Sequence, residues 1–343
     1  MQITHSRLKK FFNRKNILIT GGTGSFGNAC TKILLKYFNL KKIIIYSRDE
    51  MKQYEMAKKF PQKNIRYFIG DVRDKDRLIL AMKNVDYAIH AAALKHVSIA
   101  EYNPMECIKT NVYGAENVIN ASMICNVKRV LALSTDKATN PINLYGATKL
   151  CAEKLFINAN NLVGTEVGKE KIKFSVVRYG NIINSRGSVL PHFINLLAQG
   201  KNTLPITDKN MTRFFITQPH AVNFVLESLL MMERGEVFVP KAPSLKIVDL
   251  AKSLNQSVRY KIIGIRPGEK IHELLCSNEE SKYTKEMNRF FIIIQDAYFL
   301  SKSKIYNKGK KVKEDFEYSS KNNSNFLNFK QVKKFLKKAK IKG

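Results

Sequence analysis

An apolar run followed directly by a glycine-rich turn constrains this chain more than any other feature. Residues 16–20 read Asn-Ile-Leu-Ile-Thr, and residues 21–27 read Gly-Gly-Thr-Gly-Ser-Phe-Gly before a helical pattern begins. A strand, a glycine turn and a helix in this order are the dinucleotide-binding fingerprint. Gly21 allows the tight turn, Gly24 lets the backbone approach a pyrophosphate, and Gly27 lets the helix pack closely on the strand. The helix N-terminus then offers unpaired amides to the phosphates.

The end of the next expected strand indicates which dinucleotide would bind. Residues 41–46 lead into Ser47, Arg48 and Asp49. An acidic residue at this strand end suits the bare ribose of NAD, whereas an arginine suits the 2′-phosphate of NADP. Ser47 and Arg48 therefore favour NADP. Asp49 could touch a ribose, but we expect it to be the N-cap of the helix that runs to Phe60.

Strand-like and helical segments alternate through the first half of the chain. Strands are expected at residues 16–20, 41–46, 65–69, 85–89 and 128–134, and helices near 25–37, 49–59, 73–83, 104–124 and 143–160. This alternation predicts an α/β fold with a Rossmann-type doubly wound parallel sheet and a smaller C-terminal substrate-binding region. The expected parts are an NADP-binding domain at 12–180, a mainly substrate-binding region at 181–295, and a basic extension at 296–343.

Composition limits the class of protein. The 343 residues are 44% hydrophobic, and no apolar stretch approaches the roughly 18 residues that span a bilayer, so we expect a cytoplasmic protein. Five cysteines without a C-x-x-C pair, and six histidines without ligand spacing, predict neither a disulfide framework nor a metal site. The net charge of +31 comes from lysines in every segment, so nucleic acid is not the expected partner. The basic C-terminus is either a tail or a terminal helix.

Two pairs of residues after the fifth expected strand could carry chemistry. Asp136 and Lys137 follow that strand, and Tyr145 and Lys149 lie four residues apart on a helix that begins near Asn143. At this spacing Tyr145 and Lys149 share a helix face, so the ammonium could lower the phenol pKa towards working pH. A phenolate there could accept the proton of a substrate hydroxyl. The Tyr-x-x-x-Lys spacing alone is unspecific, because it occurs by chance in many helices.

Together, five motifs are similar to those of the extended short-chain dehydrogenases. They are residues 20–27, 46–50, 90–97, 134–149 and 266–270. More narrowly, they resemble the UDP-N-acetylglucosamine 4,6-dehydratases of the 5-inverting kind, which begin pseudaminic acid synthesis. Many related dehydratases carry Asp-Glu where this chain has Asp136-Lys137, and the membrane-anchored retaining relatives commonly carry Met at the position of Tyr145. The resemblance covers about residues 12–295.

The resemblance implies a set of binding residues and a homo-oligomer. For NADP they are Gly21, Thr23, Gly24, Ser25, Phe26, Gly27, Ser47, Arg48, Asp49, Lys52, Asp71, Val72, Ala91, Ala92, Lys95, Tyr145 and Lys149. For UDP-N-acetylglucosamine they are Lys95, Thr135, Asn181, Arg186, Thr207, Lys241, Arg266 and Glu269. The chemistry is consistent, because Arg266 offers a planar fork for a diphosphate and Glu269 can accept from ribose hydroxyls.

The catalytic residues expected from this comparison are Thr135, Asp136, Lys137, Tyr145 and Lys149. As a hypothesis, Tyr145 takes the proton of the carbon 4 hydroxyl while hydride leaves that carbon for NADP⁺, and Thr135 hydrogen-bonds the same hydroxyl. A neutral Lys137 then removes the hydrogen on carbon 5, and Asp136 protonates the hydroxyl that leaves carbon 6. Hydride returns to carbon 6, and a proton reaches carbon 5 from the opposite face. We expect nearby cations, including Lys149, to keep Lys137 neutral.

Two other readings stay open at this point. A retaining UDP-sugar 4,6-dehydratase or a UDP-sugar 4-epimerase would share the fold, although an epimerase needs no group to expel water and so has no use for Asp136 and Lys137. A non-catalytic NADP-binding regulator with a basic nucleic-acid-binding tail would explain the lysines between residues 308 and 342. Such a regulator would not require the acid and the base to be kept beside Tyr145.

Overall fold

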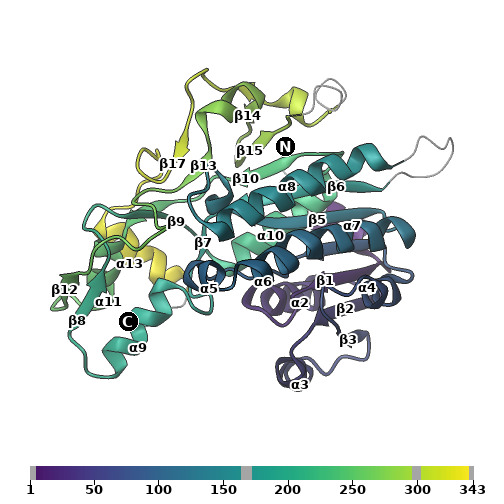
Figure 1. Ribbon diagram of the computed structural model, residues 1–343, viewed down its shortest axis with the longest axis horizontal. Coiled ribbons are helices and arrows are strands. Elements are labelled where there is room, and N and C mark those ends of the chain that lie inside the picture. Colours follow the sequence, from purple (N-terminus) through teal and green to yellow (C-terminus); the bar gives the residue numbers. More distant parts are fainter. Residues whose placement is uncertain (1–4, 164–171, 296–302, 340–343) are drawn as a thin grey trace.

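A ten-stranded sheet forms the centre of the molecule, and helices cover both of its faces (Figure 1). The computed structural model describes residues 5–163, 172–295 and 303–339. Seven neighbouring strands are parallel, in the order β3-β2-β1-β4-β5-β6-β10. They are β1 (Asn16–Thr20), β2 (Lys42–Ser47), β3 (Ile65–Ile69), β4 (Tyr87–His90), β5 (Arg129–Thr135), β6 (Lys173–Tyr179) and β10 (Val237–Pro240). The prediction of a Rossmann-type α/β fold is confirmed.

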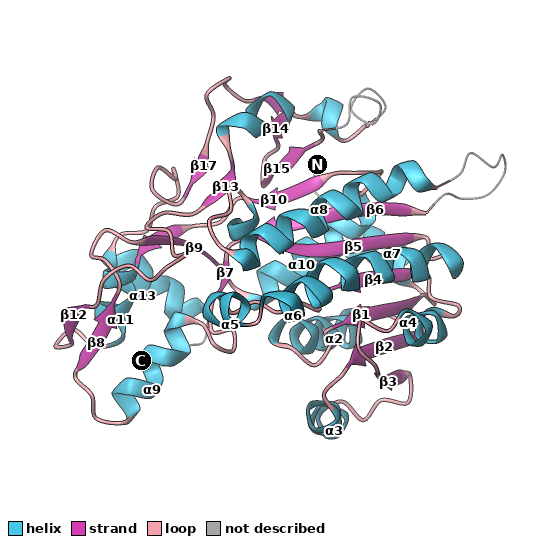
Figure 2. Ribbon diagram, viewed as in Figure 1, coloured by secondary structure: helices cyan, strands magenta, loops and turns pink. Residues whose placement is uncertain are grey.

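The helices between the strands form the two covering layers (Figure 2). They are α2 (Ser25–Tyr37), α3 (Glu50–Lys59), α4 (Lys75–Met82), α5 (Val97–Tyr102), α6 (Pro104–Ile108), α7 (Gly114–Ile124), α8 (Leu144–Leu162) and α10 (Gln218–Met231), with α1 (His5–Phe12) at the N-terminal side. α10 packs on α1 and α2, while α7 packs on α4 and α8. In the described part of the chain, no helix has both the length and the apolar character of a bilayer span.

Polar side chains set the starts of three of these helices. Asp49, Asp74 and Asn143 each accept a hydrogen bond from the backbone amide three residues further on. Such caps satisfy amides that have no partner inside the helix. The cap expected at Asp49 and the helix start expected near Asn143 are confirmed.

The segment 104–124, expected to be one helix, is interrupted. A π-helical turn, η1 (Lys109–Tyr113), joins α6 to α7. The turn contains Asn111, whose side chain is buried and bonded to a loop outside the helix. Periodicity does not reveal one inserted residue, because the apolar spacing on either side of a π turn stays helical.

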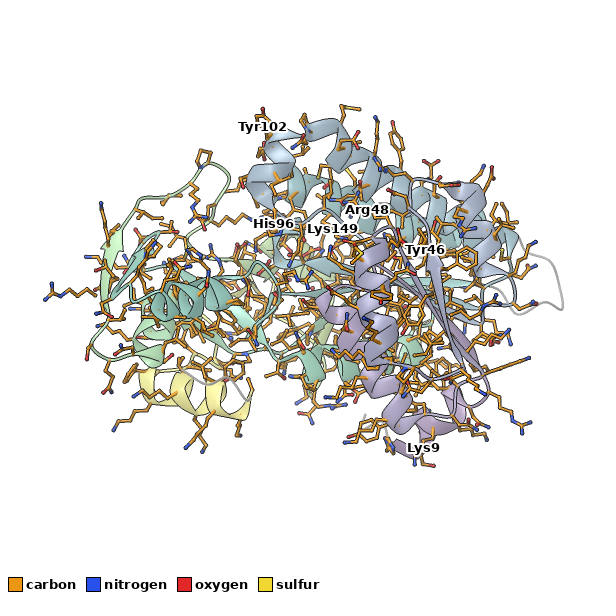
Figure 3. All side chains as sticks on the ribbon, turned by 90° about the horizontal axis from the view of Figure 1, so that it is seen from below. Lys9, Tyr46, Arg48, His96, Tyr102 and Lys149 are labelled. Atoms are coloured by element: carbon orange, nitrogen blue, oxygen red, sulfur yellow. The ribbon has the colours of Figure 1, made fainter. Side chains whose placement is uncertain are left out.

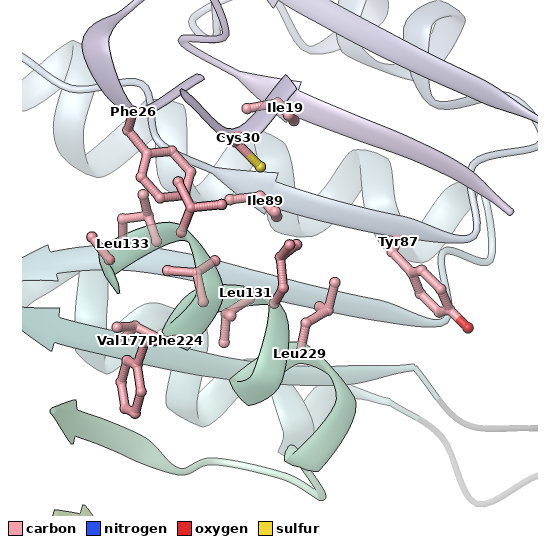
Figure 4. Close-up of a cluster of buried hydrophobic side chains, with 14 of the residues drawn as sticks. Ile19, Phe26, Cys30, Tyr87, Ile89, Leu131, Leu133, Val177, Phe224 and Leu229 are labelled. Carbon is pink, nitrogen blue, oxygen red and sulfur yellow. The ribbon is translucent and has the colours of Figure 1, made fainter. Parts of the chain in front are cut away.

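The core lies in layers on either side of the parallel strands. Because helices bury both faces, the central strands β1, β4 and β5 are mainly apolar rather than alternating. Figure 4 shows one layer, in which Phe26 of α2 and Phe224 of α10 lie with Ile19, Ile89 and Leu131 of the central strands. The rigid sheet that results is the platform for the loops at its carboxyl edge.

Residues 181–295, expected to be mainly a substrate-binding region, are divided between two parts of the molecule. Strands β10, β14 (Thr284–Glu286) and β15 (Phe290–Ile293) belong to the large sheet, where β16 (Lys310–Lys311) pairs with β14. A smaller lobe contains β7 (Asn181–Ile182), β8 (Thr203–Ile206), β9 (Thr212–Ile216), β11 (Ser244–Lys246), β12 (Arg259–Ile262), α9 (Val189–Ala198) and α11 (Ile247–Leu254). β13 (Leu274–Cys276) pairs with β17 (Tyr318–Ser319).

The basic C-terminal segment ends in a helix that packs on the smaller lobe. Val332 and Leu336 of α13 (Phe329–Lys338) are buried in the same apolar cluster as α11. The basic C-terminus was expected to be either a tail or a terminal helix, and the structure shows a terminal helix. Within the expected extension, residues 296–302 and 340–343 lie outside the described residues.

The close packing of α2 on the glycine turn predicts that a side chain at Gly27 would destabilise the protein. A Cβ added at Gly27 would lie 2.1 Å from the carbonyl oxygen of Gly22. We expect Gly27→Ala to lower the free energy of unfolding by about 1–3 kcal/mol, because the backbone of the glycine turn would have to shift to make room for the methyl group. Urea unfolding measures the change, with Lys32→Ala on the exposed side of α2 as control. At an open helix position Gly→Ala stabilises by up to about 1 kcal/mol, so a more stable Gly27→Ala protein contradicts the prediction.

Candidate active site

The loops that leave the carboxyl ends of the parallel strands meet at one edge of the sheet, where doubly wound folds bind ligands. They form a pocket with about 480 Å³ of empty space. It is lined by Gly21, Tyr46, Ser47, Arg48, Gly70, Asp71, Val72, Ala92, Ala93, Leu94 and Thr110. In the view of Figure 3, Tyr46, Arg48, Lys149 and His96 follow one another along this edge.

The glycine turn has the form of a phosphate cradle. Gly21 has a φ of 63°, and a Cβ there would lie 2.9 Å from Cα of Ala92. Gly24 is the N-cap of α2 and makes no side-chain capping bond, so the first amides of the helix are available to an anion. Thr23 and Ser47 bond to each other through their hydroxyls (2.8 Å). Phe26 is buried in the core, so only its backbone can serve a ligand.

The end of β2 presents a cation to this pocket. The Arg48 side chain is 58% exposed, and its guanidinium lies 3.9 Å from Asp71. Burial raises the pKa of Asp71, but hydrogen bonds from Arg73 outweigh burial and hold that pKa below its ordinary value. Asp49 caps α3 and its carboxylate pairs with Lys52. Arg48 thus lines the pocket at the end of β2.

Arg186, expected among the substrate residues, lies at the start of α2. Its amide donates to Oγ of Ser25 (3.2 Å), and its carbonyl accepts from Nζ of Lys95 (2.8 Å). Burial first, and then the charge of Arg186, lower the pKa of Lys95. Hydrogen bonds from Lys52 lower the pKa of Asp49, and the charge of Arg186 also lowers it. The structure therefore places Lys95 and Arg186 on the dinucleotide side of the site.

Asn111, on the π-helical turn, is a site residue that the sequence pattern did not single out. Its side chain accepts from the amide of Leu94 (2.8 Å) and donates to the carbonyl of Leu94 (2.9 Å) and to Oγ1 of Thr148 (3.0 Å). It ties the pocket loop after β4 to α8. The local signal is one polar residue within an expected helix, which is unspecific.

A compact polar cluster lies at the end of β5. Asp136 is 1% exposed and accepts from Oγ1 of Thr135 (2.9 Å) and from Nζ of Lys137 (3.0 Å). The phenol of Tyr145 is hydrogen-bonded with Thr135. Nζ of Lys137 also lies 3.3 Å from a carboxylate oxygen of Glu273. Four of the five expected catalytic residues, Thr135, Asp136, Lys137 and Tyr145, are therefore together, and Glu273 joins them.

The structure contradicts the prediction of a neutral Lys137. Burial alone would lower the pKa of Lys137, but the carboxylates of Asp136 and Glu273 outweigh burial and raise that pKa above its ordinary value. The sequence offered Asp136 as one partner, but it gave no sign of Glu273. The resting pair is therefore an ammonium and a carboxylate.

The prediction for the phenol of Tyr145 is also wrong. Burial raises the pKa of Tyr145 to about 12, although the charge of Lys137 and the hydrogen bond with Thr135 oppose the rise. Lys149 is buried on the same helix, as expected, but its Nζ donates to a backbone carbonyl of β5 (2.7 Å). Burial lowers the pKa of Lys149 to about 8, against the opposing charge of Glu153. Burial is therefore the largest cause of the pKa shift of Tyr145 and of that of Lys149.

The loop after β12 docks on the start of α8. Nδ2 of Asn143 donates to the carbonyl of Gly268 (2.7 Å), and Nζ of Lys270 donates to that of Thr139 (2.8 Å). Gly268 fits because its φ is +75° and because a Cβ would lie 2.8 Å from Asn143. These contacts bring the loop to the catalytic cluster.

Four of the expected substrate residues lie on strands and loops near this cluster. They are Asn181, Thr207, Glu269 and, on the loop after β12, Arg266. Glu269 accepts from Oγ1 of Thr207 (3.3 Å) and lies 3.9 Å from Arg213. Asn181 follows β6, and its buried amide oxygen has no hydrogen-bond partner among the described residues. Arg266 is exposed. The exposed fork of Arg266 and the unpaired oxygen of Asn181 leave polar groups for a ligand.

Lys241 does not join the other expected substrate residues. It follows β10, and its ammonium pairs with Glu286 (2.6 Å) and lies 5.2 Å from the ring centre of Phe291. Both partners belong to the antiparallel strands that extend the sheet away from β6. The position of Lys241 does not support the substrate role expected for it.

The chain is similar to known nucleotide-sugar enzymes over almost its whole length. It is 55% identical over 318 residues to the UDP-N-acetylglucosamine 4,6-dehydratase (inverting) of Campylobacter jejuni, covering 91% of this chain and 94% of that protein. It is 42% identical over 332 residues to the UDP-glucose 4-epimerase of Rickettsia bellii, covering 95% and 96%. The solved structure of Pen from Bacillus thuringiensis matches with a TM-score of 0.86 at 35% identity, covering 96% and 99%.

The fold and the site define an enzyme of the extended short-chain dehydrogenase class. Within that class the chain belongs to the polysaccharide biosynthesis protein family, whose model matches residues 17–296. The resemblance to the inverting 4,6-dehydratases inferred from the motifs is confirmed.

The buried Lys149 predicts how stability depends on pH. Its pKa of about 8 in the fold lies below its ordinary value of 10.5. The charged amine therefore destabilises the fold below about pH 8, and this cost fades as the pH rises to 10.5. We expect the stability of the wild type relative to Lys149→Met to rise with pH in this window, by at most about 1.4 kcal/mol per pH unit.

Urea unfolding of both proteins across this pH range measures the difference. Lys75→Met, at an exposed position on α4, is the matched control. A difference between wild type and Lys149→Met that stays level, or falls as the pH rises, contradicts the buried amine as its source.

Proposed function

We propose that this protein is an NADP-dependent UDP-N-acetylglucosamine 4,6-dehydratase that inverts carbon 5. Its product would be UDP-2-acetamido-2,6-dideoxy-β-L-arabino-hexos-4-ulose, formed in the first step of pseudaminic acid biosynthesis. The observation that carries the proposal is the buried contact of Asp136 with Lys137, close to Tyr145. Oxidation of an alcohol needs one base, whereas loss of water needs a further base and an acid.

The dinucleotide side of the site fits the cofactor. Gly21 and Gly24 would hold its pyrophosphate against the backbone, Arg48 its 2′-phosphate, and Asp71 its adenine. When bound, a nicotinamide dinucleotide supplies a hydride acceptor for carbon 4 of the sugar and a hydride donor for carbon 6.

Tyr145 accepts the first proton in the proposed reaction. It bonds with Thr135, which would also hold the carbon 4 hydroxyl. Because burial is what raises the phenol pKa, and the charge of Lys137 lowers it, any cation that enters the site favours the phenolate. Tyr145 then takes the hydroxyl proton as the carbon 4 ketone forms.

Asp136 and Lys137 perform the elimination after one proton moves between them. They start as carboxylate and ammonium, 3.0 Å apart. Transfer of one proton breaks an N–H bond of Lys137 and forms an O–H bond on Asp136, which gives a neutral base and a neutral acid. The Lys137 amine removes the hydrogen on carbon 5, which the ketone has acidified, while Asp136 protonates the hydroxyl leaving carbon 6. The pair ends in its starting charge state.

Inversion requires only that the new proton on carbon 5 arrive from the face opposite Lys137. The amine has taken the first proton from its own side of the ring. Protonation from the other side gives the L-arabino configuration, whereas return from Lys137 itself would retain the starting one. The pair thereby sets the face from which carbon 5 loses its proton.

A UDP-sugar 4-epimerase is the second candidate, because the Rickettsia bellii relative carries that name. An epimerase oxidises and reduces the same carbon and expels no water. Asp136 is almost fully buried and would be costly to keep there without a use. The same cost weighs against a non-catalytic NADP-binding regulator. A retaining 4,6-dehydratase also expels water, and what favours inversion over retention is Lys137 at the position where many related dehydratases carry Glu.

We further propose that the enzyme works in the cytoplasm as a homo-oligomer. Large apolar side chains are exposed on neighbouring segments: Ile99 and Tyr102 of α5, Met105 of α6 and Tyr113 of η1. Tyr102 is 88% exposed. Contiguous exposed apolar residues of this kind support a protein contact. Since the basic residues are spread over every segment, nucleic acid is not proposed as a partner.

The product formed in D₂O tests the proposed reaction. The protein is incubated with UDP-N-acetylglucosamine and NADP, and the sugar is followed by NMR. We expect a methyl group at carbon 6, a ketone at carbon 4, deuterium at carbon 5 and the L-arabino configuration. A sugar that is unchanged, epimerised only at carbon 4, or dehydrated with retention overturns the assignment.

Lys137→Ala is the matched variant for that experiment. It should lose about 10²–10⁴-fold in the rate of methyl formation, the usual contribution of a general base. Its affinity for NADP should stay close to that of the wild type. Full turnover by this variant would remove Lys137 from the mechanism.

The Arg48 position predicts the cofactor preference. We expect Arg48→Ala to weaken NADP binding by about 10–100-fold, because it removes a charged hydrogen bond worth about 1.5–3 kcal/mol. NAD binding should change little. Calorimetric titration with both cofactors measures this, with Arg289→Ala, which pairs with Glu227, as control. Wild-type protein that binds NAD more tightly than NADP would contradict the preference itself.

A further inference from the structure

Glu273 is a buried carboxylate that the reaction steps above do not use. It immediately precedes β13 and is 1% exposed. Its amide donates to Oγ of Ser320 (2.9 Å), and its carbonyl accepts from the amide of Ser320 (2.8 Å), so its backbone is fixed from both sides. One carboxylate oxygen lies 3.3 Å from Nζ of Lys137 and 3.6 Å from Nε of Arg213. The other has no hydrogen-bond partner among the described residues.

Glu273 is the second of two carboxylates within salt-bridge distance of Lys137. Asp136 and Glu273 supply two carboxylates, and Lys137 and Arg213 supply two cations. Lys270 also faces this group, and burial lowers its pKa. The phenol of Tyr145 is a further titratable neighbour, and Glu269 lies 3.9 Å from Arg213. Because an unbalanced buried charge is costly, two ionised carboxylates favour a Lys137 that keeps its proton.

The reaction needs that proton. The elimination begins with transfer from Lys137 to Asp136, so the pair must contain one proton before the sugar reacts. If Lys137 lost its proton to solvent, the amine could still act as a base, but Asp136 would stay ionised and the carbon 6 hydroxyl would lack its acid. A second carboxylate beside Lys137 prevents this loss.

We propose that Glu273 is a positioning residue that holds one proton on Lys137 and so supplies the acid that Asp136 later delivers to the substrate. The inference rests on the proposed function. It assigns to Glu273 no contact with the reacting atoms, since it acts through Lys137.

The first test measures the proton on Lys137 without any turnover. Trace acylation of the protein over a range of pH, read by mass spectrometry, reports when each lysine becomes a neutral nucleophile. In Glu273→Gln we expect Lys137 to become reactive about 1–3 pH units lower than in the wild type, the shift usual on loss of one opposite charge at this distance. Lys109, which pairs with Glu106 on the surface, should not change. An unchanged Lys137 profile overturns the proposal.

The second test compares pH profiles of methyl ketone formation. In Glu273→Gln we expect the alkaline limb of the pH–rate profile to lie about 1–3 pH units lower than in the wild type. KM at lower pH should change little. Glu273→Asp keeps the charge and should restore the wild-type limb. Glu236→Gln is the matched control, because Glu236 is also a buried carboxylate but accepts hydrogen bonds from Ser175 and from the amides of Glu233 and Arg234, outside the site. It should unfold at a lower temperature than the wild type and keep the wild-type limb.

The two proposals fail in different ways. If the wild type forms no 4-keto-6-deoxy sugar, the proposed function falls, and the acylation profile still decides whether Glu273 holds the proton on Lys137. If the wild type turns over and Glu273→Gln keeps its alkaline limb, the role of Glu273 falls alone. If Glu273→Gln does not fold, the acylation profile of Glu273→Asp must match that of the wild type, and a profile shifted to lower pH overturns the proposal.

Discussion

The guanidinium of Arg178 joins the elements on which the site depends. Arg178 lies on β6 and is 2% exposed, and it pairs with Glu153 of α8 (2.7 Å) and Glu280 of η3 (Asn278–Tyr283; 2.8 Å). It also donates to the carbonyl of Leu275 (3.0 Å), two residues beyond Glu273. One buried cation therefore fixes the catalytic helix, the central sheet and the segment that carries Glu273. A buried pair gains little net free energy, but losing one partner leaves an uncompensated charge, so the arrangement is specific.

Burial decides the protonation states in this enzyme more than any single neighbour does. It raises the pKa of Tyr145 and lowers that of Lys149, although both lie on one helix face. Lys137 departs from this rule, because two carboxylates lie within salt-bridge distance of it. The site therefore brings a phenol and an ammonium together with two carboxyl groups, and in the proposed mechanism proton transfer inside the Asp136 and Lys137 pair makes the acid and the base together.

The dinucleotide side of the site relies on backbone shape and on contacts between distant loops. Gly21 and Gly27 matter because other backbone atoms occupy the space that a side chain would need. Asn111 holds the loop after β4 by bonding both polar groups of Leu94. Arg186 crosses from the smaller lobe to the start of α2. Changes in any of these residues would alter the pocket without removing a group that touches the reacting carbons.

The sequence by itself determined the local features of this protein. The glycine turn, the caps at Asp49 and Asp74 and the spacing of Tyr145 and Lys149 each depend on residues a few positions apart, so periodicity and capping chemistry suffice to find them. Only the tertiary structure decided that Glu273 faces Lys137, that Lys241 pairs elsewhere and that Lys137 keeps its proton. The physical reason is that the charge on a buried group depends on every ion near it in space, and that chain folding, not spacing along the sequence, selects those neighbours.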